Sequence, residues 1–147
     1  MTITGIDTVA VVVSDRRKAI QWYRDALGLS VAYIGPFEPV TDQSIQGSPD
    51  KPGHWIELGP VRPLTRIHIC ELPDNHTEPG PTGITFLTDN IHAEYDRLRL
   101  MNVRFLYAPR KMDWGEWLCE FADLDGNEFD LKQPILPTNW KTGTASD

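Results

Sequence analysis

The sequence predicts an α+β fold made of two copies of one β-α-β-β-β module. The order strand, helix and three strands occurs twice, and both helical segments carry apolar residues at the spacing i, i+4 and i+7. Superposing Val13 on Thr88, at the ends of the two opening strands, gives an offset of 75 residues (88 − 13 = 75). Such modules bury their faces jointly, so we expect one domain over residues 1–147, with strongly curved mixed sheets that form a shared cleft.

The first module spans residues 3–72. Its opening strand, from Val9 to Val13, is a continuous β-branched and apolar run, as in strands covered on one or both faces. Ser14 or Asp15 can cap the helix that follows, and Gly28 can close it in the left-handed conformation. Three further strands are expected at 29–33, 54–58 and 65–72, with a long connection at 35–53. Connections of this length are typical of lids, binding loops or disordered insertions.

The second module spans residues 83–133 and follows a polar, Pro/Gly-rich linker over residues 73–82. Its opening strand ends at Leu87, and a Thr-Asp-Asn sequence caps its helix. Later strands are expected around 103–107, 117–122 and 128–132, before a polar tail over residues 134–147. The run "ADLDGNEF" alternates polar side chains like a calcium loop but lacks the downstream Glu of an EF-hand, so we expect a hairpin turn there.

Charge and composition place the chain among ordinary globular proteins. The 14 Lys and Arg against 21 Asp and Glu give a net charge of -7, which argues against a nucleic-acid partner. The chain shows no apolar run long enough to span a bilayer and no signal-peptide pattern at its start, so we expect no membrane association and a cytoplasmic location. Cys70 and Cys119 lie within apolar runs and are expected to be buried, reduced thiols.

Three stretches resemble one known family. They are "VVVSDRRKAIQWYRDALGL", "TDNIHAEYDRL" and "WGEWLCEFADLDGNEFDL", and the resemblance runs from about Ile3 to Gln133. On these residues the chain resembles the vicinal oxygen chelate superfamily, which includes glyoxalase I, bleomycin-resistance proteins, fosfomycin-resistance enzymes and extradiol dioxygenases. The resemblance implies the glyoxalase/bleomycin-resistance/dioxygenase fold and a homodimer. It says little about chemistry, because the superfamily carries unrelated activities on one scaffold.

Proteins of this superfamily usually hold a metal on residues from the first and last strand of each module. Carried over position by position, these ligands fall on Thr8 and His68 in the first module and on Gly83 and Asp130 in the second. Neither threonine nor glycine supplies a normal ligand, and divalent metal sites generally need three or more imidazole, carboxylate or thiolate donors. We therefore expect no metal and no other cofactor, with Thr8 as a residue that lines the cleft.

Strand alternation tests whether a third donor could restore a metal site. Successive side chains point to opposite faces, so Ile67 and Ile69 pack under the helix, His68 faces the cleft and Glu71 turns away from it. The same reasoning turns Asp130 toward the cleft. In "HWIEL" either His54 or Glu57 points inward, and the periodicity leaves the choice open. Alternatively, His68 is an ordinary hydrogen-bonded strand histidine, and Asp130 belongs to a solvated strand face.

Aromatic residues suggest what the cleft binds. Trp117 shares a strand face with Cys119 and fits a core position, whereas Trp114 in a loop does not. Aromatic walls with a few polar groups suit a planar or cationic organic molecule. We predict ligand contacts from Thr8, His54, His68, Tyr107, Trp114 and Asp130. The predicted function is metal-free binding of a small organic ligand. The alternative is a metal-dependent lyase, isomerase or dioxygenase that uses His68, Asp130 and a third donor.

Overall fold

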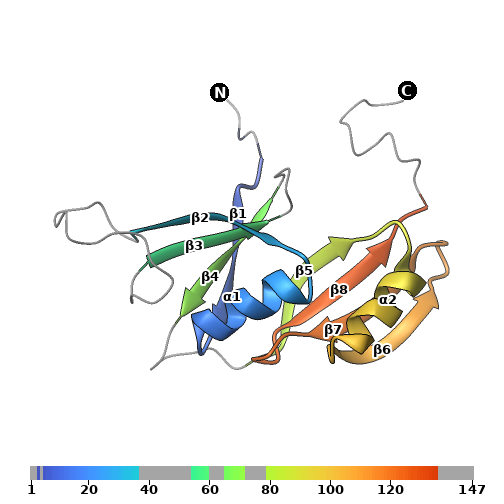
Figure 1. The fold of residues 1–147 in the computed structure, drawn as a ribbon. Coiled ribbons are helices and arrows are strands. Elements are labelled where there is room, and N and C mark those ends of the chain that lie inside the picture. The colour runs from blue at the N-terminus through green and yellow to red at the C-terminus, as the bar shows by residue number, and fades with distance from the viewer. Residues whose placement is uncertain (1–2, 4, 37–53, 60–64, 72–78, 136–147) are drawn as a thin grey trace. The chain divides into compact units, whose positions relative to one another are not determined.

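The structure, a computed structural model, describes residues 3, 5–36, 54–59, 65–71 and 79–135, except for the side chains of 32–36 and 54–56. It contains two four-stranded mixed sheets, each accompanied by one helix (Figure 1). The strand order β1-β4-β3-β2 of the first sheet is repeated as β5-β8-β7-β6 in the second. This repeat confirms the predicted pair of β-α-β-β-β modules.

The first sheet combines one parallel and two antiparallel strand pairs. Its elements are β1 (Thr8–Val13), α1 (Arg16–Asp25), β2 (Ser30–Pro36), β3 (His54–Gly59) and β4 (Arg66–Glu71). Strand β1 lies at the edge and runs parallel to β4, while β3 is antiparallel to both β4 and β2. In this register His68 lies opposite Ala10 on one side and Glu57 on the other.

The second sheet has the equivalent strand order. Its elements are β5 (Pro81–Leu87), α2 (Ile91–Leu100), β6 (Arg104–Lys111), β7 (Trp117–Ala122) and β8 (Glu128–Gln133). The described chain divides into two compact units, the first extending to Thr82 and also containing Asp123–Asn127, and the second containing the rest.

The two helices begin at equivalent capping residues. Asp15 accepts a hydrogen bond from the backbone of Lys18 (3.0 Å), and Asn90 accepts one from the backbone of Ala93 (3.1 Å). The caps are 75 positions apart (90 − 15 = 75), which reproduces the predicted offset. Asp15 is thus the cap of α1 rather than its neighbour Ser14. Gly28, after the helix, adopts φ 71°, a left-handed conformation that glycine tolerates.

Each sheet packs one apolar face into a core, and alternation predicted that face correctly. Ile67 and Ile69 of β4 are almost fully buried, with α1 contacting the strand, and Cys119 and Phe121 of β7 are buried in the second unit. Trp117 shares their face. Its ring packs edge to face against the ring of His92 on α2, with the two ring centroids 4.7 Å apart. The thiol pKa of Cys119 is raised to about 12, first by burial and then by the charge of Asp130.

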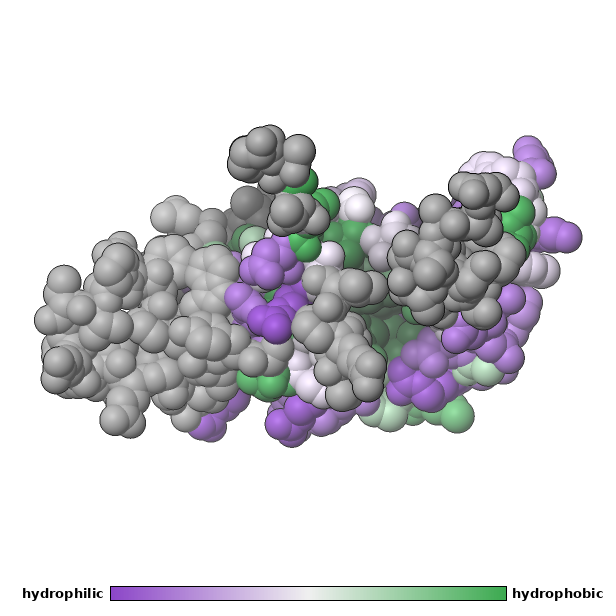
Figure 2. All heavy atoms as spheres, turned by 90° about the horizontal axis from the view of Figure 1, so that it is seen from above, coloured by the Kyte–Doolittle hydropathy of each residue, from purple (hydrophilic) through white to green (hydrophobic). Residues whose placement is uncertain are grey.

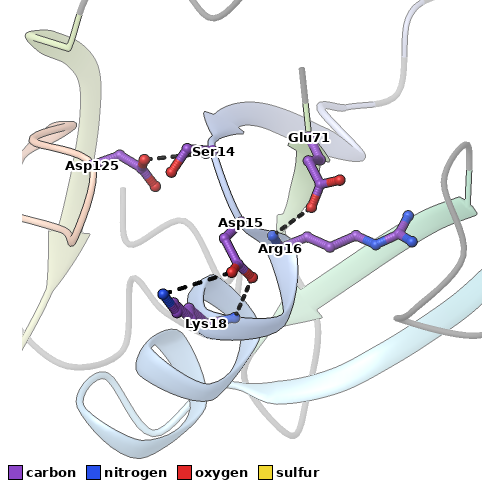
Figure 3. A network of polar contacts seen from close by, with 6 residues as sticks. All are labelled: Ser14, Asp15, Arg16, Lys18, Glu71 and Asp125. Atoms are coloured by element: carbon purple, nitrogen blue, oxygen red, sulfur yellow. Dashed lines mark hydrogen bonds and ion pairs between the residues drawn. The ribbon is translucent and has the colours of Figure 1, made fainter. Parts of the chain in front are cut away.

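The hairpin turn between β7 and β8 packs within the first unit, although it lies late in the sequence. Asp123, a buried carboxylate, accepts a 2.6 Å hydrogen bond from the hydroxyl of the fully buried Tyr23. The side-chain amide of Asn127 donates to the carbonyl of Val12 (2.8 Å), and Asp125 accepts from the backbone of Ser14 (3.1 Å; Figure 3). The predicted hairpin is confirmed, and its polar residues serve to bind strand β1 and helix α1.

Several sequence predictions lie outside the described residues. These are most of the long connection at 35–53, the linker up to residue 78, and the tail beyond residue 135. Across the part of the chain that is described, we find no helix with the length and apolar character needed to cross a membrane. On the face drawn in Figure 2, hydrophilic (purple) and hydrophobic (green) described residues are interspersed.

Candidate functional site

A group of polar side chains lies on the face of the first sheet opposite its core. We call Thr8, Glu57, Arg66 and His68 the first-sheet cluster. Paired residues on neighbouring strands point to the same face. The pairs Thr8 with Arg66 and Glu57 with His68 therefore place all four side chains on one face, while Ile67 and Ile69 occupy the other.

An ion pair crosses this cluster diagonally. The Nη1 atom of Arg66 donates to Oε2 of Glu57 at 2.9 Å, and the Glu57 side chain is only 10% exposed. Gly59 makes the geometry possible, because a Cβ there would lie 3.2 Å from Cγ of Arg66. The Nε atom of Arg66 is buried and has no hydrogen-bond partner among the residues that the structure describes. An unsatisfied buried donor lowers the stability of a folded protein by about 1–3 kcal/mol.

His68 is almost fully buried beside this ion pair. Burial lowers the pKa of His68 below its usual 6.5, and the neighbouring Glu57 carboxylate offsets only part of that effect. The imidazole is therefore mostly neutral at pH 7, with one ring nitrogen able to donate a hydrogen bond and the other able to accept one.

A cavity of about 360 Å³ lies along the free edge of β1 in the first unit. That volume is within the range of small-molecule sites, about 300–1,000 Å³. Ala10, which pairs with His68, lines this cavity, so the cavity begins beside the first-sheet cluster. Its lining residues are Ala10, Val11, Val12, Pro79, Gly80, Pro81, Thr82 and Asn127.

The corresponding face of the second sheet carries aromatic and acidic groups. Glu120 lies directly opposite Asp130 on β8 and is paired with Tyr107 on β6. The guanidinium of Arg110 stands 4.1 Å above the Tyr107 ring. Partial burial, followed by the charge of Asp130, raises the pKa of Glu120. We call Tyr107, Arg110, Glu120 and Asp130 the second-sheet cluster.

Trp114 lies in the connection between β6 and β7 and is 63% exposed. Its indole nitrogen donates to Oε2 of Glu116 (3.0 Å), and the same oxygen lies 3.2 Å from the ammonium group of Lys132. These contacts hold a large aromatic surface toward solvent, which agrees with the interpretation that Trp114 is no core residue.

Most of the chain matches a single family model. Residues 5–131 match the family model of the Glyoxalase/Bleomycin resistance protein/Dioxygenase superfamily. The chain belongs to this superfamily. This membership confirms the resemblance that the sequence showed.

Three bacterial proteins illustrate what this chain is similar to. The Bacillus subtilis (strain 168) protein YetH, described as uncharacterized, is 31% identical over 132 residues, which are 89% of this chain and 99% of that protein. A superfamily member from Sphaerobacter thermophilus DSM 20745 has a crystal structure with a TM-score of 0.72 at 26% identity, covering 90% of this chain and 98% of that one. TnmS3, an antibiotic binding protein from Streptomyces sp. CB03234, gives a TM-score of 0.68 at 24% identity over 91% of this chain and 98% of its own, which shows a shared fold.

The described residues of each unit, taken by themselves, do not fit a divalent metal. In the first-sheet cluster the only imidazole and carboxylate are His68 and Glu57, and Arg66 already places a cation on Glu57. In the second unit Gly83 offers no side chain at the equivalent of Thr8. Among the described residues, no three His, Cys, Asp or Glu side chains gather as metal ligands would.

The predicted contact residues divide between the two units. Thr8 and His68 come together in the first-sheet cluster, while Tyr107 and Asp130 share the second-sheet cluster. The side chain of His54 lies outside the described residues.

The structure also shows where four further residues lie: Glu57, Glu71, Arg66 and Arg110. Of the two alternatives in "HWIEL", the register places Glu57 beside His68. Glu71 turns away as predicted, and its carboxylate accepts from the backbone of Arg16 (2.8 Å; Figure 3). Sequence reasoning assigned no role to Arg66 or Arg110, although alternation already placed Arg66 on the face of His68.

Proposed function

We propose that this superfamily member binds a small organic molecule without a divalent metal. The observation that carries the proposal is the Glu57–Arg66 ion pair next to His68, because it puts a fixed positive charge where a metal ion would need to sit. The cavity beside Ala10 and the antibiotic-binding description of TnmS3 support a ligand of small-molecule size. Thr8 and His68 are the proposed contacts in the first unit, and Tyr107, Trp114 and Asp130 those in the second.

A metal-dependent lyase, isomerase or dioxygenase is the second candidate. It is favoured by one observation, the low pKa of His68, since a neutral imidazole is the form that coordinates a metal. In that reaction Glu57 would have to leave Arg66 to serve as a further donor. Metal analysis of the purified protein separates the candidates: about one equivalent of Zn, Ni, Fe or Mn per chain favours the enzyme.

Binding is tested by titrating the protein with a panel of planar aromatic compounds, antibiotics included, while tryptophan fluorescence and thermal stability are followed. We expect at least one compound to bind, with an affinity about tenfold lower in His68→Ala, since that variant loses one polar contact.

Ile67→Ala is the control, because Ile67 is buried on the opposite face of the same strand. It should lower the free energy of unfolding by about 2–5 kcal/mol and leave the affinity of the folded protein unchanged. If His68→Ala loses stability in the same way with unchanged affinity, the proposed site is wrong.

A further inference from the structure

The Nε–H of Arg66 is a buried donor in the first-sheet cluster for which the described part of the chain supplies no acceptor. In the same guanidinium, Nη1 donates a hydrogen bond to Oε2 of Glu57 at 2.9 Å. The Glu57 bond and the passage over Gly59 keep the guanidinium close to Glu57. A donor with no acceptor among the described residues is suited to an acceptor that a ligand brings.

The charges around this donor decide which acceptor fits. Glu57 offsets the charge of Arg66, and a carboxylate on the ligand would lie close to the Glu57 carboxylate. Two carboxylates in a largely buried setting repel each other, whereas a neutral oxygen meets no such penalty. Thr8, paired with Arg66, adds a hydroxyl on the same face that can donate a second hydrogen bond.

We propose that the first-sheet cluster recognises a neutral carbonyl oxygen, such as that of a ketone, lactone or amide, through the Nε–H of Arg66. This inference rests on the proposed binding function and names the chemical group that one end of the site selects. The Arg66 side chain is 30% exposed, and we expect its guanidinium to turn toward a bound ligand and so present Nε. Bond formation then removes the cost of the unsatisfied donor, and that gain is available only to ligands with an acceptor.

A matched pair of compounds tests the proposal. The ketone 4-chromanone and its parent chromane differ only in that the carbonyl of the first is a CH₂ group in the second. We expect the wild-type protein to bind 4-chromanone about tenfold more tightly, the effect of one well-placed hydrogen bond. In ¹H–¹⁵N spectra the Nε–Hε resonance of Arg66 should move on addition of 4-chromanone and stay in place with chromane.

Arg66→Lys is the matched variant, because lysine keeps a cation for Glu57 but has no Nε–H. In this variant the affinities for 4-chromanone and chromane should be about equal, while chromane binds as it does to the wild-type protein. A preference that survives in Arg66→Lys, or is missing from the wild-type protein although both compounds bind, overturns the carbonyl inference and leaves the binding function standing. If neither compound binds, and no compound of the wider panel does, the binding function fails together with the inference.

Two further measurements test the carbonyl inference independently of the Arg66→Lys variant. If Arg66→Lys does not fold, the two wild-type affinities and the movement of the Arg66 resonance decide the question alone. Chroman-2-carboxylate provides the charged comparison: we expect it to bind more weakly than 4-chromanone, and tighter binding would show that the cluster selects anions instead.

Discussion

At the scale of single residues, position on a strand separates core from site. Ile67 and His68 are neighbours in β4 and both are buried, yet one packs toward α1 and the other joins Glu57 and Arg66 on the opposite face. Burial therefore means different things for the two. For Ile67 it stabilises the fold through apolar area, and for His68 it stabilises the neutral form of the ring.

The buried imidazole predicts a pH dependence of stability. Burial holds the pKa of His68 in the folded protein below the 6.5 of the unfolded chain, so the unfolded state binds a proton more readily. The contribution of His68 is present above about pH 6.5 and is lost as the pH falls through the lower, folded-state pKa. Urea unfolding from pH 7.5 to 5 should show a falling free energy of unfolding.

The control for this pH dependence is His68→Asn, which keeps a polar side chain that does not titrate. The decrease of its stability toward low pH should be smaller than that of the wild type, since only the other ionisable groups remain. Equal slopes in the two proteins would contradict the assignment of a low pKa to His68.

At the scale of elements, the pairing of β3 with β4 builds the first-sheet cluster. The register Leu58 with Ile67 and Glu57 with His68 brings Gly59 beside Arg66, whose side chain then crosses to Glu57. A shift of this register by one residue would exchange the two faces and put Glu57 under the helix. The ion pair thus depends on the strand register and on glycine at position 59, which has no Cβ.

Gly59→Ala tests this arrangement. The new Cβ would lie 3.2 Å from Cγ of Arg66, closer than nearly all such contacts, so Arg66 must move away from Glu57. We expect the free energy of unfolding to fall by about 1 kcal/mol in a urea titration.

Two comparisons isolate the cause of that loss. Gly5→Ala, where a Cβ meets nothing within 4 Å, should change stability by less than about 0.5 kcal/mol. In an Arg66→Ala background the Gly59→Ala change should cost less than in the wild type, because the two positions are coupled. A full effect in that background would show that the crowding involves some other group.

At the scale of the whole molecule, the first unit depends on a segment from the second half of the sequence. The turn Asp123–Asn127 accepts the hydrogen bond of the fully buried Tyr23 hydroxyl and donates to the carbonyl of Val12. Burial and then the Asp123 carboxylate raise the pKa of Tyr23, so its hydroxyl keeps its proton and remains a donor at ordinary pH. Without this turn a buried hydroxyl would lose its acceptor, at a cost of about 1–3 kcal/mol.

Splitting the chain before β5 tests this dependence. A fragment of residues 1–80 lacks the turn, and we expect it to show no cooperative thermal unfolding by circular dichroism. Mixing it with a fragment of residues 81–147 should restore strand and helix signals, because the second fragment supplies Asp123–Asn127. Cooperative unfolding of the first fragment alone would show that the turn is dispensable for folding.

Local sequence patterns determined the repeated module, its helices and the faces of its strands. These features depend on neighbours a few residues apart, so a cap such as Asp15 or the alternation around His68 can be recognised in one dimension. The choice between His54 and Glu57 stayed open, since alternation leaves two equivalent phases until a partner strand selects one. The diagonal reach of Arg66 over Gly59 likewise requires a register between strands.

Only the tertiary structure revealed that the "DLDGN" turn belongs with the first unit. Its contact with Tyr23 joins residues 100 positions apart, and its contact with Val12 joins residues 115 positions apart. Hairpin propensity identifies the turn from its own residues but carries no information about the distant groups it will bind. The sequence therefore determined each module and the polar positions of its strands, and packing decided which of those positions contact one another, because such contacts exist only between strands and turns that folding brings together.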